Sequence, residues 1–182
     1  MTKLRSYDTD ELVLHRLFFA LMPSADAIEE IATIRDGLGP VKMPVADERL
    51  HMTLFVHDRA TTPDPDLIDR MSKVAAKIAQ PAMRIALGEL IGAGDNVLLR
   101  PGDHMPVLGA FRDKLAYGLA VAGIPSKRGY RFNPHVTIAY GMRDSFRRSI
   151  PLISWRSEEL VLVHILVGLT EHRILGRWKL GE

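Results

Sequence analysis

Two short segments of the chain repeat one pattern of residues that can carry out acid and base chemistry. His51 and Thr53 belong to the run Leu-His-Met-Thr-Leu, and His135 and Thr137 belong to Pro-His-Val-Thr-Ile. Successive side chains of a β-strand point to opposite faces, so each histidine is predicted to share a face with its threonine. The aliphatic neighbours then face a core. Two such strands side by side would gather two imidazoles and two hydroxyls in one cleft.

A pair of histidines fits one class of reaction well. Histidine titrates nearest to neutral pH, so two imidazoles can divide the work of base and acid in a single step. Phosphodiester chemistry needs this division, because one group takes a proton from the attacking oxygen while the other protonates the departing alkoxide. The hydroxyls of Thr53 and Thr137 could donate hydrogen bonds to the non-bridging oxygens. The predicted catalytic residues are therefore His51, Thr53, His135 and Thr137.

Metal binding is a competing use of the same side chains. His51, His57, His104 and His135 could supply nitrogen ligands, but no two histidines have the i, i+4 spacing of a zincin helix. The chain has no cysteine, which excludes a disulfide framework, thiol catalysis and thiolate-bound metal. It also has no P-loop and no G-x-G-x-x-G sequence. We expect no metal and no other cofactor.

Composition indicates one compact domain. The chain has 182 residues, of which 47% are hydrophobic, and this is enough to bury a core that needs no covalent cross-links. No apolar run reaches the roughly 20 residues of a membrane span, and no signal peptide is recognisable. We therefore expect a cytoplasmic monomer with no membrane contact and no obligate protein partner. Residues 1–14 are expected to form a flexible tail, and residues 1–182 are taken as one domain, within which two lobes are possible.

The charge distribution is uneven although the net charge is only +2. Eight basic residues against two acids lie between Arg112 and Arg148, around the second histidine motif. Such a skew predicts a basic rim that suits a polyanionic ligand. An ordinary solvated surface is the alternative interpretation.

Hydrophobic periodicity and turn residues predict an α+β fold rather than a doubly wound parallel sheet. Each histidine strand comes after a strand and a helix, as if one module occurred twice. The expected strands cover residues 16–21, 49–56, 83–91, 96–100, 131–140, 159–168 and 172–180. The expected helices cover residues 25–38, 67–78 and 105–122.

At the two histidine motifs the chain resembles the two-histidine (2H) phosphoesterase superfamily. Within it, the chain is similar to the RNA 2′,3′-cyclic phosphodiesterases that are also called 2′-5′ RNA ligases. The likeness extends to residues 16–23, 44–54, 131–139 and 177–180. It implies a bilobal α+β fold, with two related antiparallel lobes around a central cleft. It also implies metal-independent hydrolysis of a 2′,3′-cyclic phosphate to a 2′-phosphate, with an RNA end or a cyclic nucleotide as the substrate and 2′-5′ ligation as the reverse reaction.

The resemblance also assigns roles to individual residues. His51 would protonate the leaving 3′ oxygen, and His135 would activate water. Arg131 and Phe132 stand where the family commonly has an arginine that contacts phosphate and an aromatic ring that stacks on a base. Tyr140 stands where an arginine is frequent. We expect Arg131, Phe132 and Tyr140 to bind the substrate.

Other positions depart from the family pattern. The first motif continues with Phe55-Val56-His57-Asp58 where Phe-Leu-Gly is common, and His172 lies in a region where serine and tyrosine are usual. These departures leave the substrate open. The alternatives are another small cyclic phosphate, a 2′-5′-linked oligonucleotide, or a non-catalytic module that binds RNA or a nucleotide.

Overall fold

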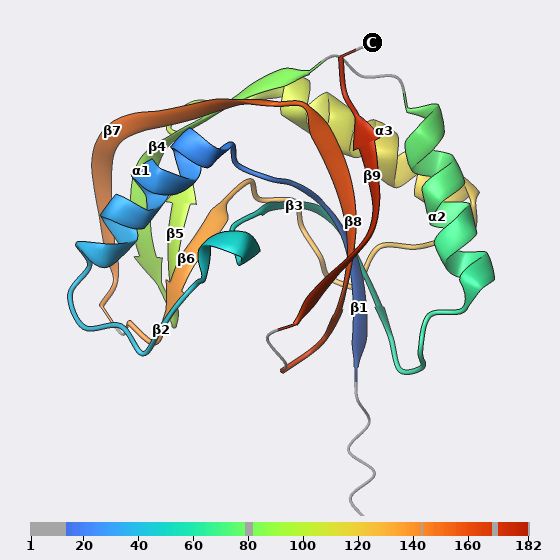
Figure 1. Ribbon diagram of the computed structural model, residues 1–182, viewed down its shortest axis with the longest axis horizontal. Helices are drawn as coiled ribbons and strands as arrows, with labels where there is room; N and C mark the ends of the chain where they lie inside the picture. Colours follow the sequence, from blue (N-terminus) through green and yellow to red (C-terminus); the bar gives the residue numbers. More distant parts are fainter. Residues whose placement is uncertain (1–13, 79–81, 143, 169–170, 182) are drawn as a thin grey trace, which may run out of the picture.

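The structure is a computed structural model that describes residues 14–78, 82–142, 144–168 and 171–181 (Figure 1). The expected tail lies outside these ranges, except for Leu14. The helices are α1 (Ala25–Asp36), α2 (Pro65–Lys77), α3 (Pro106–Val121) and the short 3₁₀ helix η1 (Asp47–Arg49). The strands are β1 (His15–Leu21), β2 (Met43–Pro44), β3 (Met52–Arg59), β4 (Met83–Ala93), β5 (Asn96–Arg100), β6 (Val136–Tyr140), β7 (Phe146–Ser157), β8 (Glu159–Leu166) and β9 (His172–Lys179).

The strands form one sheet in the order β7-β4-β5-β6-β3-β1-β8-β9, with β2 added beside β6. Every strand pairing in the described ranges is antiparallel. Figure 1 shows two groups of strands, one with β4 to β7 and the other with β1, β3, β8 and β9. The groups meet where β3 pairs with β6 through the single pair Met52 and Val136. The fold is therefore a bilobal α+β fold, as the sequence predicts.

The junction joins the central residues of the two histidine motifs. Met52 is the residue between His51 and Thr53, and Val136 is the residue between His135 and Thr137. Because the pairing is antiparallel, one further step of register would place His51 opposite Thr137 and Thr53 opposite His135. The fold thus brings the two motifs together in opposite directions at the centre of the sheet.

Helices bury one face of each half. Helix α1 contacts β6 and β7, whereas α2 contacts β9 and α3, and α3 contacts β3. The main core takes Leu17, Phe19 and Leu21 from β1, while Phe18 and Ala20 point to the other face and join a smaller cluster. This alternation is what a strand buried on both faces requires. The face that carries Phe18 is the one that forms the site.

Helix ends follow their sequence signals. The Ser24 hydroxyl accepts a hydrogen bond from the amide of Ala27 at 3.3 Å, and the Asp64 carboxylate accepts one from Leu67 at 2.7 Å. These bonds satisfy amides that the first turn of a helix leaves unpaired. Pro65 takes the first position of α2, where its missing N–H costs nothing.

The sequence prediction of strands misses two elements, β2 and β7, and begins both histidine strands too early. Residues 146–157 are not among the expected strands, yet they form β7, which pairs with β4 along most of its length. The histidine strands begin later than expected, because η1 occupies residues 47–49 and β6 starts only at Val136. Each catalytic candidate histidine therefore lies one residue before its strand.

Candidate functional site

The two candidate histidines are held by the same local hydrogen bond. The Nδ1 of His51 lies 2.6 Å from the carbonyl oxygen of Arg49, and the Nδ1 of His135 lies 2.6 Å from that of Asn133. A carbonyl can only accept, so Nδ1 carries the hydrogen and donates it. This bond fixes the tautomer and leaves Nε2 of each ring to exchange a proton.

A matching irregularity follows each threonine. Ala20 pairs with Thr53 and Phe19 with Phe55, so Leu54 is an extra residue in β3. In the same way Leu98 pairs with Thr137 and Val97 with Ala139, so Ile138 is extra in β6. A bulge of this kind changes which side chains face each side of the strand.

The bulges have the same effect on both strands. In β3, both Leu54 and Phe55 point into the main core, and Val56 lies on the same face as Thr53, in the lining of the site. In β6, Tyr140 likewise lies on the same face as Thr137. A regular strand would have placed Val56 and Tyr140 on the core face, three residues from their threonines.

One cavity of about 260 Å³ collects the motif residues, and we name it the motif cavity. His51, Thr53, His135, Thr137 and Tyr140 all line it. The structure thus brings together both predicted imidazoles, both hydroxyls and one of the predicted binding residues.

Two other predicted binding residues lie apart from the motif cavity. Arg131 is exposed and is not among the residues that line this cavity. Phe132 packs against the main core beneath the guanidinium of Arg112, at 5.6 Å from the ring centre, and lines a separate cavity near Pro101 and His104. Their contact with a substrate stays a prediction.

Besides the aliphatic side chains of Val45, Val56 and Ile165, sequence reasoning missed four charged or ring-bearing side chains that line the motif cavity: Arg16, Phe18, Arg49 and His172. They come from β1, η1 and β9, far apart in the chain. The strand alternation of β1 was a usable signal for Arg16 and Phe18, since both share the face opposite Leu17. No local signal marks His172, because β9 reaches the site only through its pairing with β8.

Three rings pack together around His51. The Phe18 ring stacks on His51 with centres 4.8 Å apart, and the His172 ring lies edge-on to His51 at 5.5 Å and to Phe18 at 5.8 Å. The pKa of His51 is lowered to about 4, mainly by burial and to a lesser extent by the positive charges that His172 and His135 carry when protonated, although the bond to the Arg49 carbonyl opposes the shift. Burial also lowers the pKa of His172. His51 is therefore neutral at pH 7 in the empty cleft.

Two guanidinium groups reach the motif cavity from the same half of the sheet. Arg16 binds both carboxylate oxygens of Asp58, at 2.7 and 2.9 Å, and Lys127 lies 3.4 Å from the same carboxylate. Arg16 and Lys127 hold the pKa of Asp58 below its usual range, although burial opposes them. Arg49 differs, because none of the ion pairs among the described residues involves it. Of the two arginines that line the motif cavity, Arg49 is therefore the one whose charge no carboxylate neutralises.

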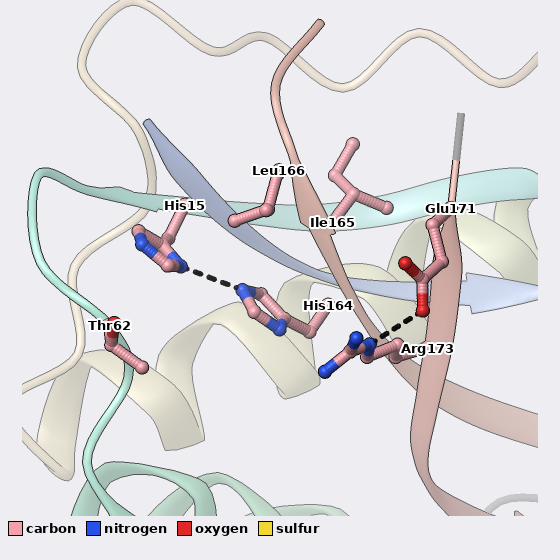
Figure 2. Close-up of a pocket in the computed structure, with 7 residues that line it drawn as sticks. All are labelled: His15, Thr62, His164, Ile165, Leu166, Glu171 and Arg173. Atoms are coloured by element: carbon pink, nitrogen blue, oxygen red, sulfur yellow. Dashed lines mark hydrogen bonds and ion pairs between the residues drawn. The ribbon is translucent and has the colours of Figure 1, made fainter. Parts of the chain in front are cut away.

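A second pair of histidines occupies a different cavity of about 160 Å³ (Figure 2). The Nδ1 of His15 lies 3.0 Å from the Nε2 of His164, and the two rings are stacked 5.2 Å apart. His15 alternates with Arg16 along β1, so it points to the face of Leu17 and away from the motif cavity. None of the motif residues lines the cavity in Figure 2.

Metal-ligating side chains do not gather in the part of the chain that the structure describes: it holds no group of three or more that could bind an ion. In that same part, no helix is long and apolar enough to cross a membrane.

Comparisons with known proteins agree with this geometry. The family model of the 2′-5′ RNA ligase superfamily matches residues 23–166. No curated protein sequence matches. The fold is similar to that of E. coli LigT in a crystal structure with 3′-AMP, with 24% identity, a TM-score of 0.76, and coverage of 93% of this chain and 99% of that chain.

Two further solved structures have the same fold. The protein TT0787 of Thermus thermophilus has 16% identity and a TM-score of 0.74, over 90% of this chain and 97% of that chain. The PDE domain of MHV ns2 is more distant, with 14% identity and a TM-score of 0.52 over 79% of this chain and 98% of that chain. The chain thus belongs to the 2′-5′ RNA ligase superfamily, the 2H phosphoesterases, and has a fold like that of LigT.

Proposed function

We propose that this protein is a metal-independent cyclic phosphodiesterase that hydrolyses 2′,3′-cyclic phosphate ends of RNA or of a nucleotide to 2′-phosphates. One observation carries the proposal: two imidazoles with equivalent Nδ1 hydrogen bonds, together with two threonine hydroxyls, line a single cavity. Acid and base groups on opposite sides of one phosphorus are what in-line hydrolysis requires.

The reaction balances with these groups alone. One Nε2 removes a proton from water as its oxygen forms a bond to phosphorus. The bond between phosphorus and the 3′ oxygen breaks, and the other Nε2 gives its proton to that oxygen. The product carries a 2′-phosphate and a free 3′-hydroxyl. The same groups could run the same step with a 5′-hydroxyl in place of water: its oxygen would bond to phosphorus as the bond to the 3′ oxygen breaks, which would be 2′-5′ ligation.

Charge on the phosphate is balanced by donors on the cavity wall. Thr53 and Thr137 would donate hydroxyl hydrogen bonds to the non-bridging oxygens, and Arg49 would contribute its guanidinium. Arg16 is already bound to Asp58, so we assign it a supporting place in the wall. Tyr140 lines the same wall and is proposed to contact the substrate.

The resemblance gives His51 the role of acid and His135 the role of base. Because its pKa is lowered, His51 carries no proton to donate at neutral pH while the cleft is empty. An incoming phosphate anion would stabilise the protonated ring and raise its pKa. Under this proposal His51 becomes protonated when the substrate binds, and can then act as the acid.

A second candidate function keeps the chemistry and changes the substrate, to another small cyclic phosphate or a 2′-5′-linked oligonucleotide. Crystal structures of E. coli LigT hold 3′-AMP, NADP+ and ATP, so a similar fold accepts several nucleotides. A purely binding module is the third candidate. It would have no use for two histidines with equivalent proton-exchanging nitrogens.

The test is hydrolysis of a short RNA that ends in a 2′,3′-cyclic phosphate, in buffer with EDTA. Wild type is compared with His51→Ala and His135→Ala. His57→Ala is the control, because His57 also bonds a carbonyl, that of Pro125 at 2.8 Å, but does not line the motif cavity. We expect a 2′-phosphate product from wild type and the control only. Activity lost in EDTA, or retained in both motif variants, would contradict the proposal.

A further inference from the structure

A second cavity shares a wall with the motif cavity. It measures about 350 Å³, and we name it the side cavity. Four residues line both cavities: Phe18, Arg49, His51 and His172. The three packed rings around His51 therefore stand between the two spaces. One ligand could occupy both cavities by passing beside these rings, because His51 and His172 each line both cavities.

The side cavity differs in character from the motif cavity. Its other walls include Met22, Val163 and Ile174, in place of the threonines and His135. Val163 belongs to the small cluster around Phe18, while Ile174 is 44% exposed although it is a large apolar side chain. Its volume falls within the range of about 300–1,000 Å³ that is common for ligand cavities. Apolar walls of this kind suit a flat, weakly polar group.

One carboxylate at this cavity has free acceptor capacity. Glu48 is exposed and, within the described residues, forms no ion pair. Glu171 also lines the side cavity, but its carboxylate binds Arg173 at 2.8 Å. An ionised carboxylate only accepts hydrogen bonds, so Glu48 selects a ligand whose edge presents N–H groups.

We propose that the side cavity is the nucleobase subsite of this protein and that Glu48 makes it prefer bases with adjacent N–H donors, guanine above all. The inference rests on the proposed function, because it places the base of the same substrate whose cyclic phosphate enters the motif cavity. Guanine presents N1–H and N2–H side by side, which matches the two oxygens of one carboxylate. Uracil offers a single N–H between two carbonyls and is the poorest match.

The placement favours this cavity over the one that contains Phe132. Phe132 lines a cavity that has no lining residue in common with the motif cavity. The side cavity instead shares four residues with it. A base and a cyclic phosphate are joined through one ribose, so their sites must adjoin.

The first test compares hydrolysis of 2′,3′-cyclic GMP, 2′,3′-cyclic UMP and an abasic ribose 2′,3′-cyclic phosphate. We expect kcat/KM for the abasic compound to be lower than for cyclic GMP by roughly tenfold or more. Ile174→Trp fills the cavity from an exposed position, and should bring the ratio of kcat/KM for cyclic GMP over the abasic compound down toward one. Equal rates for all three wild-type substrates would overturn the proposal.

Glu48→Gln tests the base preference. It keeps the shape of the side chain but removes the charge, so the ratio of kcat/KM for cyclic GMP over cyclic UMP should fall by about tenfold or more. Glu29→Gln is the matched control, since Glu29 is an exposed glutamate on α1 outside both cavities. A ratio that stays the same in Glu48→Gln would refute the role of Glu48.

A binding measurement separates this inference from the proposed function. Guanosine 2′-phosphate and ribose 2-phosphate are added to the full chain with ¹³C-labelled methyl groups, and the NMR signals of Met22 and Ile174 are followed. Only the guanosine compound should shift both methyl signals. A shift without any cyclic phosphate hydrolysis would support the subsite and refute the enzyme. Hydrolysis with both signals unmoved would refute the subsite alone.

Discussion

The two halves of the sheet present the same motif in different surroundings. His51 and His135 have the same 2.6 Å bond from Nδ1 to a carbonyl two residues earlier, and both threonines precede a bulge. Around His51, however, Phe18 and His172 pack against the ring, and its hydrogen bond is partly buried. The bond of His135 is exposed.

The shared geometry of the two histidines and the difference in their surroundings have separate physical causes. The backbone of each half makes the two imidazoles alike in tautomer and direction. Neighbours from β1 and β9 then bury His51 and lower its pKa. Equal geometry places both imidazoles for one reaction, and the packing around His51 sets the protonation state of that ring.

The largest expected effect comes from removing either member of the pair. His51→Ala and His135→Ala should each lower kcat/KM for a 2′,3′-cyclic phosphate by about 10² to 10⁴. Steady-state kinetics measures the loss, and circular dichroism checks that both variants are folded. If one variant kept nearly full activity, the two histidines would not share the work of one step.

Substitutions of the two threonines test whether the two halves of the sheet contribute equally to hydrogen bonding of the phosphate. Thr53→Val and Thr137→Val keep the shape of the side chain and remove the donor, so each should cost about 10²-fold in kcat. Comparing the two losses shows whether the donors are equivalent. A loss confined to KM would place the hydroxyls in ground-state binding and not in transition-state stabilisation.

The low pKa of His51 should appear in the pH dependence of stability. The unfolded chain binds a proton at His51 near pH 6.5 and the folded chain only near pH 4, so between these values the unfolded state holds more protons. The free energy of unfolding should therefore fall by about 3 kcal/mol as pH drops from 6.5 to 4. Urea denaturation of wild type and of His51→Gln at several pH values measures this pH-dependent change in the free energy of unfolding, which the variant should lack. Identical pH slopes would contradict the assigned burial.

His172 should have the smallest of these effects. His172→Phe keeps an aromatic ring beside His51 and removes the charge, so only the lesser cause of the lowered pKa disappears. The inflection of kcat/KM that reports His51, near pH 4 in wild type, should move upward by less than about one unit. An unchanged or downward inflection would show that His172 does not repel a proton on His51. Activity that rises toward low pH would assign His51 as the acid, and activity that falls would assign it as the base.

The sequence predicted the helices and most strands because their signals are local. Ser24 is a residue type that favours the N-cap of a helix, and it caps α1; Gly94 and Asp95 form the short turn between β4 and β5. Strand β7 escaped prediction for a physical reason: Pro151 stands in its middle, and proline argues against a strand inside a sheet. β7 is an edge strand, and its register against β4 shifts around Gly88, so the missing N–H is tolerated there.

The charge pattern was a misleading guide to the site. The basic excess between Arg112 and Arg148 suggested a rim near the second motif, but several of these cations meet protein partners, such as Arg147 on Glu89 and Lys127 on Asp58. The guanidinium groups that line the motif cavity are Arg16 and Arg49, from the other half. Counting charges along the chain cannot show which side chains face one another.

By itself, the sequence determined the two His-x-Thr segments, their shared face and hence the chemistry to expect, because strand periodicity is a property of consecutive residues. Only the tertiary structure decided that the motifs meet through Met52 and Val136, and that the bulges turn Tyr140 toward the cleft. It also decided that Phe18 and His172 surround His51 and lower its pKa. Burial and the distances between charges set that pKa, and both depend on contacts between strands far apart in the chain.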